Sequence, residues 1–415
     1  MSLPSSIDYA RELPTLPANA VAREVVVRPS NGSQFLPNST LQFDLVNSSF
    51  IDPASVHIRY TYTCVNAAPA SLIGAPYIAP FARSNVFFGS TQAESISAYN
   101  QVVSALSVLT LDVSQRYGLQ SAYGYSAGAG VPMTIENLDG RVVAINETGT
   151  MSGHLPNILT NSDKLFPAFL APQVRLELVM DSVASMSRLD APLTNFTITN
   201  AELVYKMIDM GSEVEQMVRS QGDVMIRSSS FMNTAAVLGA GAIGSTSLVY
   251  NQRLASIKSA FLLMSNGAAN SNGWGDSFDV CNTAGQYSLL IAGTSVPQTP
   301  LSVSNNRAGI LMALKAACGS LSDKGNSQSI NAIEFNYAEA AATTLAEPSK
   351  FIVGVDLEVI DNDFLLSGIS SQNSAISAQI VLNVATTVQH QISLLLHYDA
   401  IIEISADTGF ASVKM

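Results

Sequence analysis

The sequence of 415 residues predicts an all-β protein: two consecutive eight-stranded jelly rolls, which are closed β-sandwiches, in one chain with a few short helices. Three observations support this fold class. The residue pattern is typical of short strands and turns, the two halves of the chain resemble each other, and the length suits two domains of about 200 residues each.

Runs of Val, Ile, Thr, Phe and Tyr recur along the chain between clusters of Pro, Gly, Asn and Ser, a pattern typical of strands joined by turns. In residues 40–46 the alternation places Leu41, Phe43 and Leu45 on one face of a strand. The predicted strands lie at 23–29, 40–46, 55–64, 174–180, 196–208, 223–228, 350–360, 375–384 and 391–404.

Two segments show the helical spacing of apolar residues instead. The first is 93–113, where Thr91 and Glu94 match a capping box that would satisfy free N–H groups at the start of a helix. The second is 305–320, with the Ser-Asn pair at 304–305 as candidate N-caps. Each half of the chain therefore carries one helix near its middle.

The two halves repeat a similar order of segments about 200 residues apart, which indicates duplication of one β unit. The segment around Arg28 matches that around Arg227, and the strand from Phe196 matches the one from Ile392. A β unit of this size needs closed edges, which a jelly roll provides. The predicted division is an N-terminal arm at 1–22, a first jelly roll at 23–208, a linker helix at 209–222, a second jelly roll at 223–405 and a C-terminal tail at 406–415.

The composition is apolar and poor in charge, with 47% hydrophobic and 13% charged residues. No apolar run approaches the roughly 18 residues that would span a bilayer. The net charge of −12 argues against a nucleic-acid groove, which needs a basic stripe. Because uncharged surface is easily desolvated, we expect much of it to be buried against copies of the same chain.

Other whole-chain features point to a reducing compartment and buried thiols. The three cysteines, Cys64, Cys281 and Cys318, are odd in number and far apart, so buried thiols are expected rather than a disulfide framework. The first 20 residues lack the basic and apolar regions of a secretory signal. The Asn-X-Ser/Thr sequons are accordingly expected to be unused.

Residues 237–245, VLGAGAIGS, have the glycine spacing of a dinucleotide-binding fingerprint at Gly239, Gly241 and Gly244. That motif needs a strand before it and an acid about 20 residues after it, which holds the ribose. The preceding segment is a poor strand candidate, and no Asp or Glu occurs between Asp223 and Asp276. We therefore expect a flexible loop and no cofactor.

A second apparent motif, GYSAG at 124–128, has the spacing of a hydrolase nucleophile elbow around Ser126. Neither an apolar strand before it nor a helix after it is evident. The histidines that could serve as its base, His154, His390 and His397, are expected to be surface or packed groups. The loop interpretation is preferred, and the chain is predicted not to be an enzyme.

No metal-binding pattern stands out among the four histidines, which also include His57. Asp356 and Glu358 are expected on one strand face; a calcium role is conceivable for their oxygens, but a solvated strand end is favoured. Trp274 is predicted to be a loop anchor or interface residue rather than a platform for a sugar. The sequence thus offers no catalytic, cofactor-binding or metal-binding residue.

Four stretches, taken in order, carry a family resemblance. Their features are first strands with a turn at Asp52–Pro53 (41–60), an E-x-I-x-x-Y-N helix entry at Glu94, Ile96, Tyr99 and Asn100 (86–102), a roll end running into a linker helix (170–180 and 196–218), and a closing turn at Ser367–Gly368–Ile369–Ser370 (350–384). Together they resemble the double jelly-roll major capsid proteins of icosahedral DNA viruses, the group of tailless membrane-containing phages, virophages and polinton-like viruses.

The resemblance implies a homotrimer whose six rolls form a pseudo-hexagonal block that tiles the facets of an icosahedral virion. It implies contacts between trimers and with penton and minor capsid proteins, and it allows an internal membrane as a partner. The chain would be made in the host cytoplasm or nucleus. Few basic residues lie in the arm and tail, so no direct sequence-specific binding to nucleic acid is expected. The alternative is a two-domain β-sandwich carbohydrate-binding surface protein, which glycan binding by the monomer would support.

Overall fold

The computed structural model describes most of the chain from residue 20 to the C-terminus. The described residues are 20–66, 70–125, 141–187, 192–266, 284–291, 293–303, 307–321, 330, 335, 351–359, 366–373, 375–383, 385–386, 389–406 and 408–415.

The first half of the chain folds into a sandwich of two antiparallel sheets. Its strands are β1 (Val21–Val27), β2 (Gln34–Phe35), β3 (Thr40–Asp44), β4 (Phe50–Cys64), β6 (Phe81–Phe88), β7 (Thr91–Ser97), β9 (Thr148–His154), β10 (Phe166–Pro167), β11 (Val174–Met180) and β12 (Phe196–Asp209). One sheet has the order β1-β12-β4-β10, with β2 added to β12 and β9 to β4, and the facing sheet has the order β3-β11-β6-β7. Tyr60 of β4 and Phe81 of β6 pack edge to face between the sheets, with ring centroids 5.9 Å apart.

Short elements surround this sandwich. They are the small sheet of β5 (Ala70–Leu72) and β8 (Arg141–Val143), the helices α1 (Tyr99–Thr110), α2 (Val113–Gly118), α3 (Gln120–Tyr123) and α4 (Val183–Met186), and the helix α5 (Ser212–Ser220) that leads to the second half. The helical spacing in the sequence did not indicate α2, α3 or α4, because each is only one or two turns long.

The second half forms another antiparallel sandwich. Its elements are β13 (Val224–Leu238), β14 (Gly244–Tyr250), β15 (Ile257–Asn266), β16 (Ala284–Ile291), β17 (Thr294–Ser302), α6 (Arg307–Gly319), β18 (Ile352–Asp356), β19 (Ile376–Leu382), β20 (His390–Ile404) and β21 (Ala411–Lys414). One sheet has the order β13-β20-β15-β18, with β21 added to β20, and the other has the order β14-β19-β16-β17.

The two sandwiches share one strand order. The strands of these two pairs of sheets correspond when they are matched in chain order. The order β1-β12-β4-β10 then corresponds to β13-β20-β15-β18, and β3-β11-β6-β7 corresponds to β14-β19-β16-β17. The two longest helices, α1 and α6, each follow the last strand of the second sheet. The predicted fold class of two jelly rolls is confirmed, and Phe196 and Ile392 lie in the equivalent strands β12 and β20.

The first predicted helix begins later than expected. Residues 91–97 form β7, and α1 starts at Tyr99 after Ala98, whose φ is 48°. The expected capping-box pair caps no helix, because Glu94 pairs with Val86 of β6 instead. Pairing with β6 gives the segment a backbone ladder and buries the apolar side chains of this strand, so tertiary contacts override the local helix signal.

Asp52–Pro53 lies inside β4 rather than in a turn. Pro53 has no N–H to give to the ladder, and the pairing of β4 with β12 shifts register at this point. The Oγ of Ser55 accepts a hydrogen bond of 2.8 Å from the amide of Lys206 in place of a backbone oxygen. The dipeptide therefore lies where the ladder between β4 and β12 is interrupted.

The folded region is also longer at both ends than predicted. Strand β1 begins at Val21, inside the predicted arm, and pairs along β12 from that residue. Residues 411–414, expected in a tail, form β21 and pair with Ile401–Ile404 of β20. Unpaired backbone in these segments gains hydrogen bonds by extending an existing sheet edge, which hydrophobic patterning alone does not reveal.

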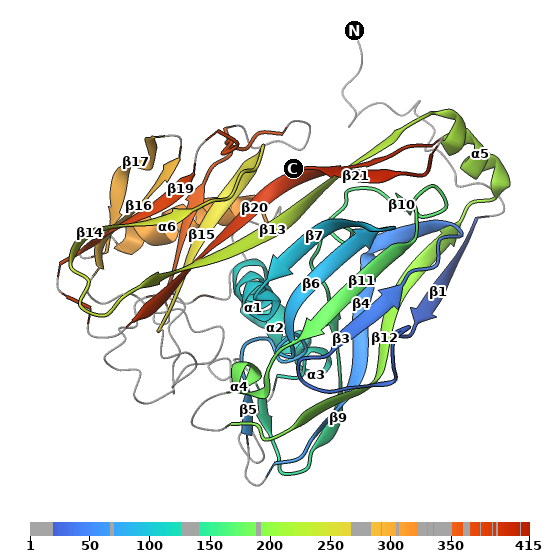
Figure 1. The fold of residues 1–415 in the computed structure, drawn as a ribbon, viewed down its shortest axis with the longest axis horizontal. Coiled ribbons are helices and arrows are strands. Elements are labelled where there is room, and N and C mark those ends of the chain that lie inside the picture. The colour runs from blue at the N-terminus through green and yellow to red at the C-terminus, as the bar shows by residue number, and fades with distance from the viewer. Residues whose placement is uncertain are drawn as a thin grey trace.

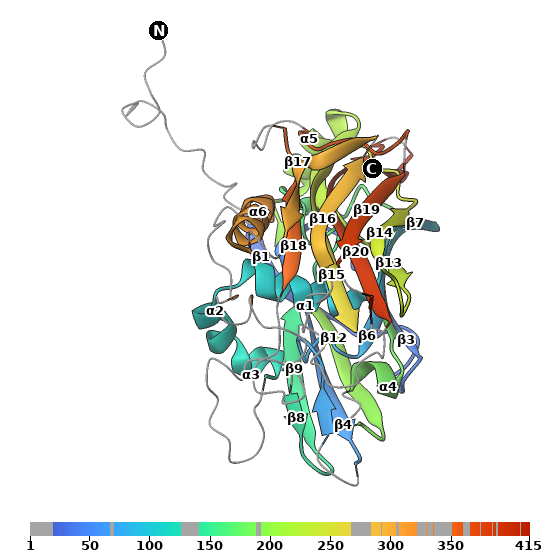
Figure 2. The same ribbon diagram turned by 90° about the vertical axis from the view of Figure 1, so that its left-hand side faces the viewer.

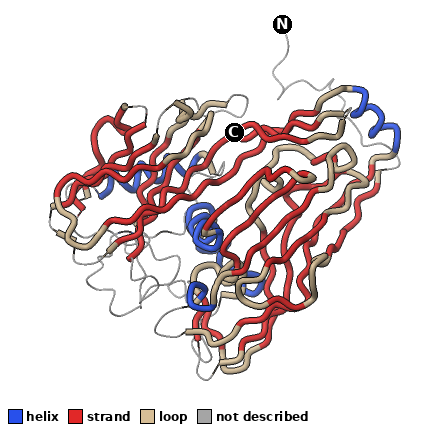
Figure 3. The backbone as a smooth tube through the Cα atoms, in the orientation of Figure 1, coloured by secondary structure: helices blue, strands red, loops and turns tan. Residues whose placement is uncertain are grey.

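The long strands of the second roll reach across the first roll (Figure 1). Strands β13 and β21 contact β7, and α6 lies beside β18, as Figure 2 shows. Figure 3 shows that strands fill both sandwiches while helices lie at their margins. One continuous cluster of buried apolar side chains includes residues of both rolls. Within the described part of the chain, no helix has the length and apolar character needed to cross a membrane.

Candidate functional site

The glycine-rich stretch at 237–245 contains the turn that joins the end of β13 in one sheet of the second roll to the start of β14 in the other. Gly241 and Gly244 have φ values of 80° and 78°, which glycine adopts without a Cβ clash. The loop is present as predicted, but the expectation of a poor strand before it is wrong, since β13 runs to Leu238. A strand follows the glycines, so no helix N-terminus faces them as a phosphate site would require.

Thr386 fastens this turn through its side chain and its backbone. Its hydroxyl donates to the carbonyl of Gly239 at 2.8 Å and accepts from the amide of Ala242 at 3.0 Å. Its backbone exchanges two further bonds with Gly241 and Ala242, of 2.8 and 3.0 Å. The backbone groups that would bind phosphate in a nucleotide site are therefore occupied by the loop before β20.

The other candidate residues are dispersed. Ser126 and Trp274 lie outside the described residues, whereas His154 is in β9 and both His390 and His397 are in β20. His154 Nδ1 is 2.9 Å from the carbonyl oxygen of Val56, and burial lowers the pKa of this histidine. Among the residues that the structure describes, no group of three or more His, Cys, Asp or Glu is placed to hold a metal ion.

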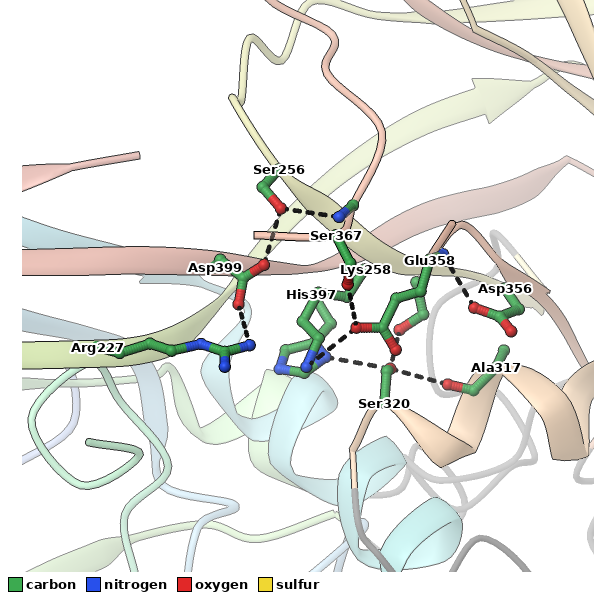
Figure 4. Close-up of polar contacts among 12 residues, drawn as sticks. Arg227, Ser256, Lys258, Ala317, Ser320, Asp356, Glu358, Ser367, His397 and Asp399 are labelled. Atoms are coloured by element: carbon green, nitrogen blue, oxygen red, sulfur yellow. Dashed lines mark hydrogen bonds and ion pairs between the residues drawn. The ribbon is translucent and has the colours of Figure 1, made fainter. Parts of the chain in front are cut away.

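The sequence predicted that Asp356 and Glu358 share a strand face, and this is wrong, because β18 ends at Asp356. An Oε1–Nζ distance of 3.3 Å joins Glu358 to Lys258, and the same oxygen accepts a bond from Ser367 (Figure 4). The carboxylate of Glu358 is buried and already has a cation partner. Glu358 therefore forms a structural ion pair with Lys258 and is not a solvated strand end.

A second buried acid is Asp399 of β20 (Figure 4). Its carboxylate lies 3.3 Å from Arg227 Nη2 and accepts a bond of 2.8 Å from Ser256 Oγ. The same hydroxyl accepts the amide of Gly368 at 3.0 Å. These contacts fasten the turn at Ser367–Gly368–Ile369–Ser370 to β15 and β20.

Between these two ionic groups, His397 stacks on Phe231 with ring centroids 5.0 Å apart. Its Nδ1 is 3.2 Å from Ser320 Oγ. Burial lowers the pKa of His397 to about 3, and the charge of Lys258 contributes. A histidine that stays neutral to such low pH is a weak general base, so the contact with Ser320 is not an activated nucleophile.

The two rolls meet along a polar seam, defined here by β7 and residues 157–163 of the first roll and by β13 of the second. Hydrogen bonds cross it at three places near residue 160. These join Ser228 Oγ to the oxygen of Ile158 (2.5 Å), Asn161 Nδ2 to the oxygen of Ser229 (3.1 Å), and the amide of Asp163 to the oxygen of Arg227 (3.1 Å).

Glu94 lies inside this seam and is only 3% exposed. Its Oε1 accepts bonds from the amide of Ile158, at 2.9 Å, and from the hydroxyl of Ser230 on β13. Its Oε2 has no hydrogen-bond partner. Burial raises the pKa of Glu94 to about 7, against the opposing effect of these two bonds.

Sequence reasoning missed this role because Glu94 was assigned to a helix cap. A usable signal was present: in a strand, Glu94 shares a face with Ile96, and both are buried.

The edges of the second roll are protected unequally. In the sheet β14-β19-β16-β17, the edge strand β17 contains Pro297 and Pro300, which discourage pairing with another strand. At the other edge, β14 contains neither proline nor charge and pairs with β19 alone among the described strands.

The surface around β14 is uncharged and combines exposed serines with exposed apolar side chains. Val237, Ile243 and Val249 are 57%, 63% and 58% exposed, and no charged residue occurs between Arg227 and Arg253. This surface, called the β14 edge below, consists of β14 and residues 237–243 before it.

Structural comparison shows that the double-roll fold occurs elsewhere. VP54 of PBCV-1, whose crystal structure was fitted into a reconstruction of the virophage Sputnik, matches with a TM-score of 0.64 at 8% identity, over 98% of this chain and 99% of that one. The Faustovirus major capsid protein matches with a TM-score of 0.58 at 9% identity, over 95% and 92% of the two chains. The mavirus major capsid protein matches with a TM-score of 0.55 at 8% identity, over 100% and 93%.

These likenesses extend over nearly the full length of each chain, so the pair of rolls and their order are shared, at identities that establish fold alone. No family model and no curated protein matches the sequence.

Proposed function

We propose that this chain is a major capsid protein and acts as a structural building block without catalysis. The observation that carries the proposal is the full-length match of both rolls, in the same order, to solved major capsid proteins of several viruses. Fold alone can host many functions, so the properties of the surface must also suit assembly.

The β14 edge suits a contact between copies of the chain. An unpaired, uncharged strand edge is a template for association, and little charge has to be desolvated when such a surface is covered. In the proposed homotrimer, three chains contribute six rolls and form a pseudo-hexagonal block. Obligate interfaces of this kind bury about 2,000–5,000 Å².

The proposed location is the shell of an icosahedral virion. With a net charge of −12, the chain is not expected to hold duplex DNA, so another layer would separate the shell from the genome. Penton proteins, minor capsid proteins and an internal membrane are the proposed further partners.

Native mass measurement together with negative-stain microscopy tests the proposal. A stable trimer with a hexagonal outline is expected, and it should form flat hexagonal arrays at high concentration. A well-behaved monomer would overturn the proposal. Glycan binding by such a monomer would favour the carbohydrate-binding alternative, and tight binding to duplex DNA at physiological salt would contradict the proposed separation from the genome.

A further inference from the structure

The seam between the rolls contains a carboxyl group without a compensating cation. Glu94 is buried between β7 and β13, and only one of its oxygens receives hydrogen bonds. Two acids of the second roll with buried carboxylates differ in this respect, because Asp399 is paired with Arg227 and Glu358 with Lys258. Glu94 thus lies in a setting that accepts a neutral acid better than a carboxylate.

The groups that face Glu94 come from five segments of the chain and are neutral. The start of α1 brings Tyr99 and β20 brings Tyr398; burial raises the pKa of both tyrosines, so they stay protonated. Strand β13 contributes the hydroxyl of Ser230, the turn at 157–163 contributes the Ile158 amide, and β6 contributes backbone pairing at Val86.

The charged residues elsewhere in the seam leave Glu94 uncompensated. Arg227 is held by Asp399, and among the described residues no charged group shifts the pKa of Glu94.

We propose that Glu94 is a proton-controlled lock between the two rolls, which strengthens the seam while the carboxyl is neutral and weakens it when the carboxyl ionises. An ionised Glu94 leaves one charged oxygen without a donor in a buried interface, and water can reach it only if β7 and β13 separate. The lock belongs to the single chain and does not depend on the capsid role.

The direction of the pH effect follows from proton binding. The pKa of Glu94 is about 7 in the fold and 4.5 as its ordinary value. Between these values the folded chain binds more protons than the unfolded chain, so this contribution is complete below pH 4.5 and is lost as the pH rises through 7. The full difference corresponds to about 300-fold in the unfolding equilibrium constant.

Glu94→Gln tests the lock, because glutamine copies the shape of the neutral acid and does not titrate. Denaturant unfolding of the isolated full chain is measured from pH 5 to 8.5 for the wild type and the variant. We expect similar unfolding constants at pH 5 and a variant that is increasingly more stable than the wild type as the pH rises, approaching about 100-fold at pH 8.5. A difference that stays constant with pH would overturn the proposal.

A matched control is Glu202→Gln. Glu202 is partly buried and hydrogen-bonded by Arg59 at 2.6 Å, which holds its pKa below the ordinary value, so it is ionised throughout this range. We expect its effect on stability to be independent of pH from 5 to 8.5. A pH-dependent difference in this control equal to that of Glu94→Gln would also overturn the proposal, because the effect would then not be specific to the seam.

Two further measurements separate the lock from a general effect on folding. Ser230→Ala removes a hydrogen bond that lowers the pKa of Glu94, so the loss of stability should still begin near pH 4.5 but extend to higher pH. Hydrogen exchange at the amides of Ile158 and Asp163, compared between wild type and Glu94→Gln at one pH, reports the seam itself. Faster exchange in the wild type at pH 8.5 but not at pH 5 is expected; equal exchange at both would contradict the lock even if the chain assembles.

Discussion

Ile257 and Ile369 exchange two backbone hydrogen bonds, of 2.9 and 3.0 Å, and so fasten the turn after β18 to the start of β15. A Cβ on Gly368 would lie 2.4 Å from the oxygen of Ile257, closer than atoms can approach. We expect Gly368→Ala to lower the free energy of unfolding by about 1–3 kcal/mol, measured by denaturant titration. Gly319→Ala is the control, because a Cβ there meets nothing within 4 Å; equal losses in both would contradict the close approach.

Removal of the buried carboxylate at Asp399 should lower the stability more than removal of a carboxylate that pairs with an exposed lysine. Asp399→Ala leaves the guanidinium of Arg227 and the hydroxyl of Ser256 without this acceptor, and we expect a loss of about 3–5 kcal/mol in the free energy of unfolding. Glu403→Ala breaks a pair whose partner, Lys414, is 62% exposed, and should cost less than about 1 kcal/mol. Thermal and denaturant unfolding of the two variants measure both losses. A larger loss of unfolding free energy in Glu403→Ala than in Asp399→Ala would contradict the prediction.

His397 should make the second roll sensitive to acid. Its pKa is about 3 in the fold against an ordinary 6.5, so between these values the unfolded chain binds the extra proton. The free energy of unfolding therefore falls as the pH is lowered from 6.5 towards 3, by at most about 4–5 kcal/mol. His397→Gln should flatten this part of the pH profile in denaturant titrations, whatever its effect at pH 7. Identical slopes in both proteins would show that His397 does not carry the effect.

The β14 edge should carry a contact between chains in the proposed assembly. Val249→Lys places a charge on an exposed position of this strand, and charged edge residues oppose strand pairing and association. We expect this variant to remain folded and to shift from trimer to monomer in light scattering coupled to size exclusion. Gln298→Lys, at an exposed position of the proline-containing edge strand β17, should leave the trimer intact. Loss of the trimer in both variants, or in neither, would place the contact elsewhere.

Features that depend on neighbours in the chain could be predicted from the sequence. Alternation placed Leu41 and Phe43 on a buried face, and the turn at Gly239–Gly244 follows from residues that tolerate positive φ. The matching of Phe196 with Ile392 correctly indicated a repeated unit. The two jelly rolls were predictable because burial of alternating strands and closure of their edges leave few architectures.

Features that depend on what packs against a residue were decided by tertiary structure. Glu94 has the local pattern of a helix cap, yet pairing with β6 makes it a strand residue and the approach of β13 buries it. Lys258 and Glu358 are about 100 residues apart, so no spacing in the sequence announces their ion pair. The physical reason is that strand alternation and turn conformation are set by local sterics and hydrophobicity, whereas the protonation and partners of a polar group depend on which distant segments remove it from water.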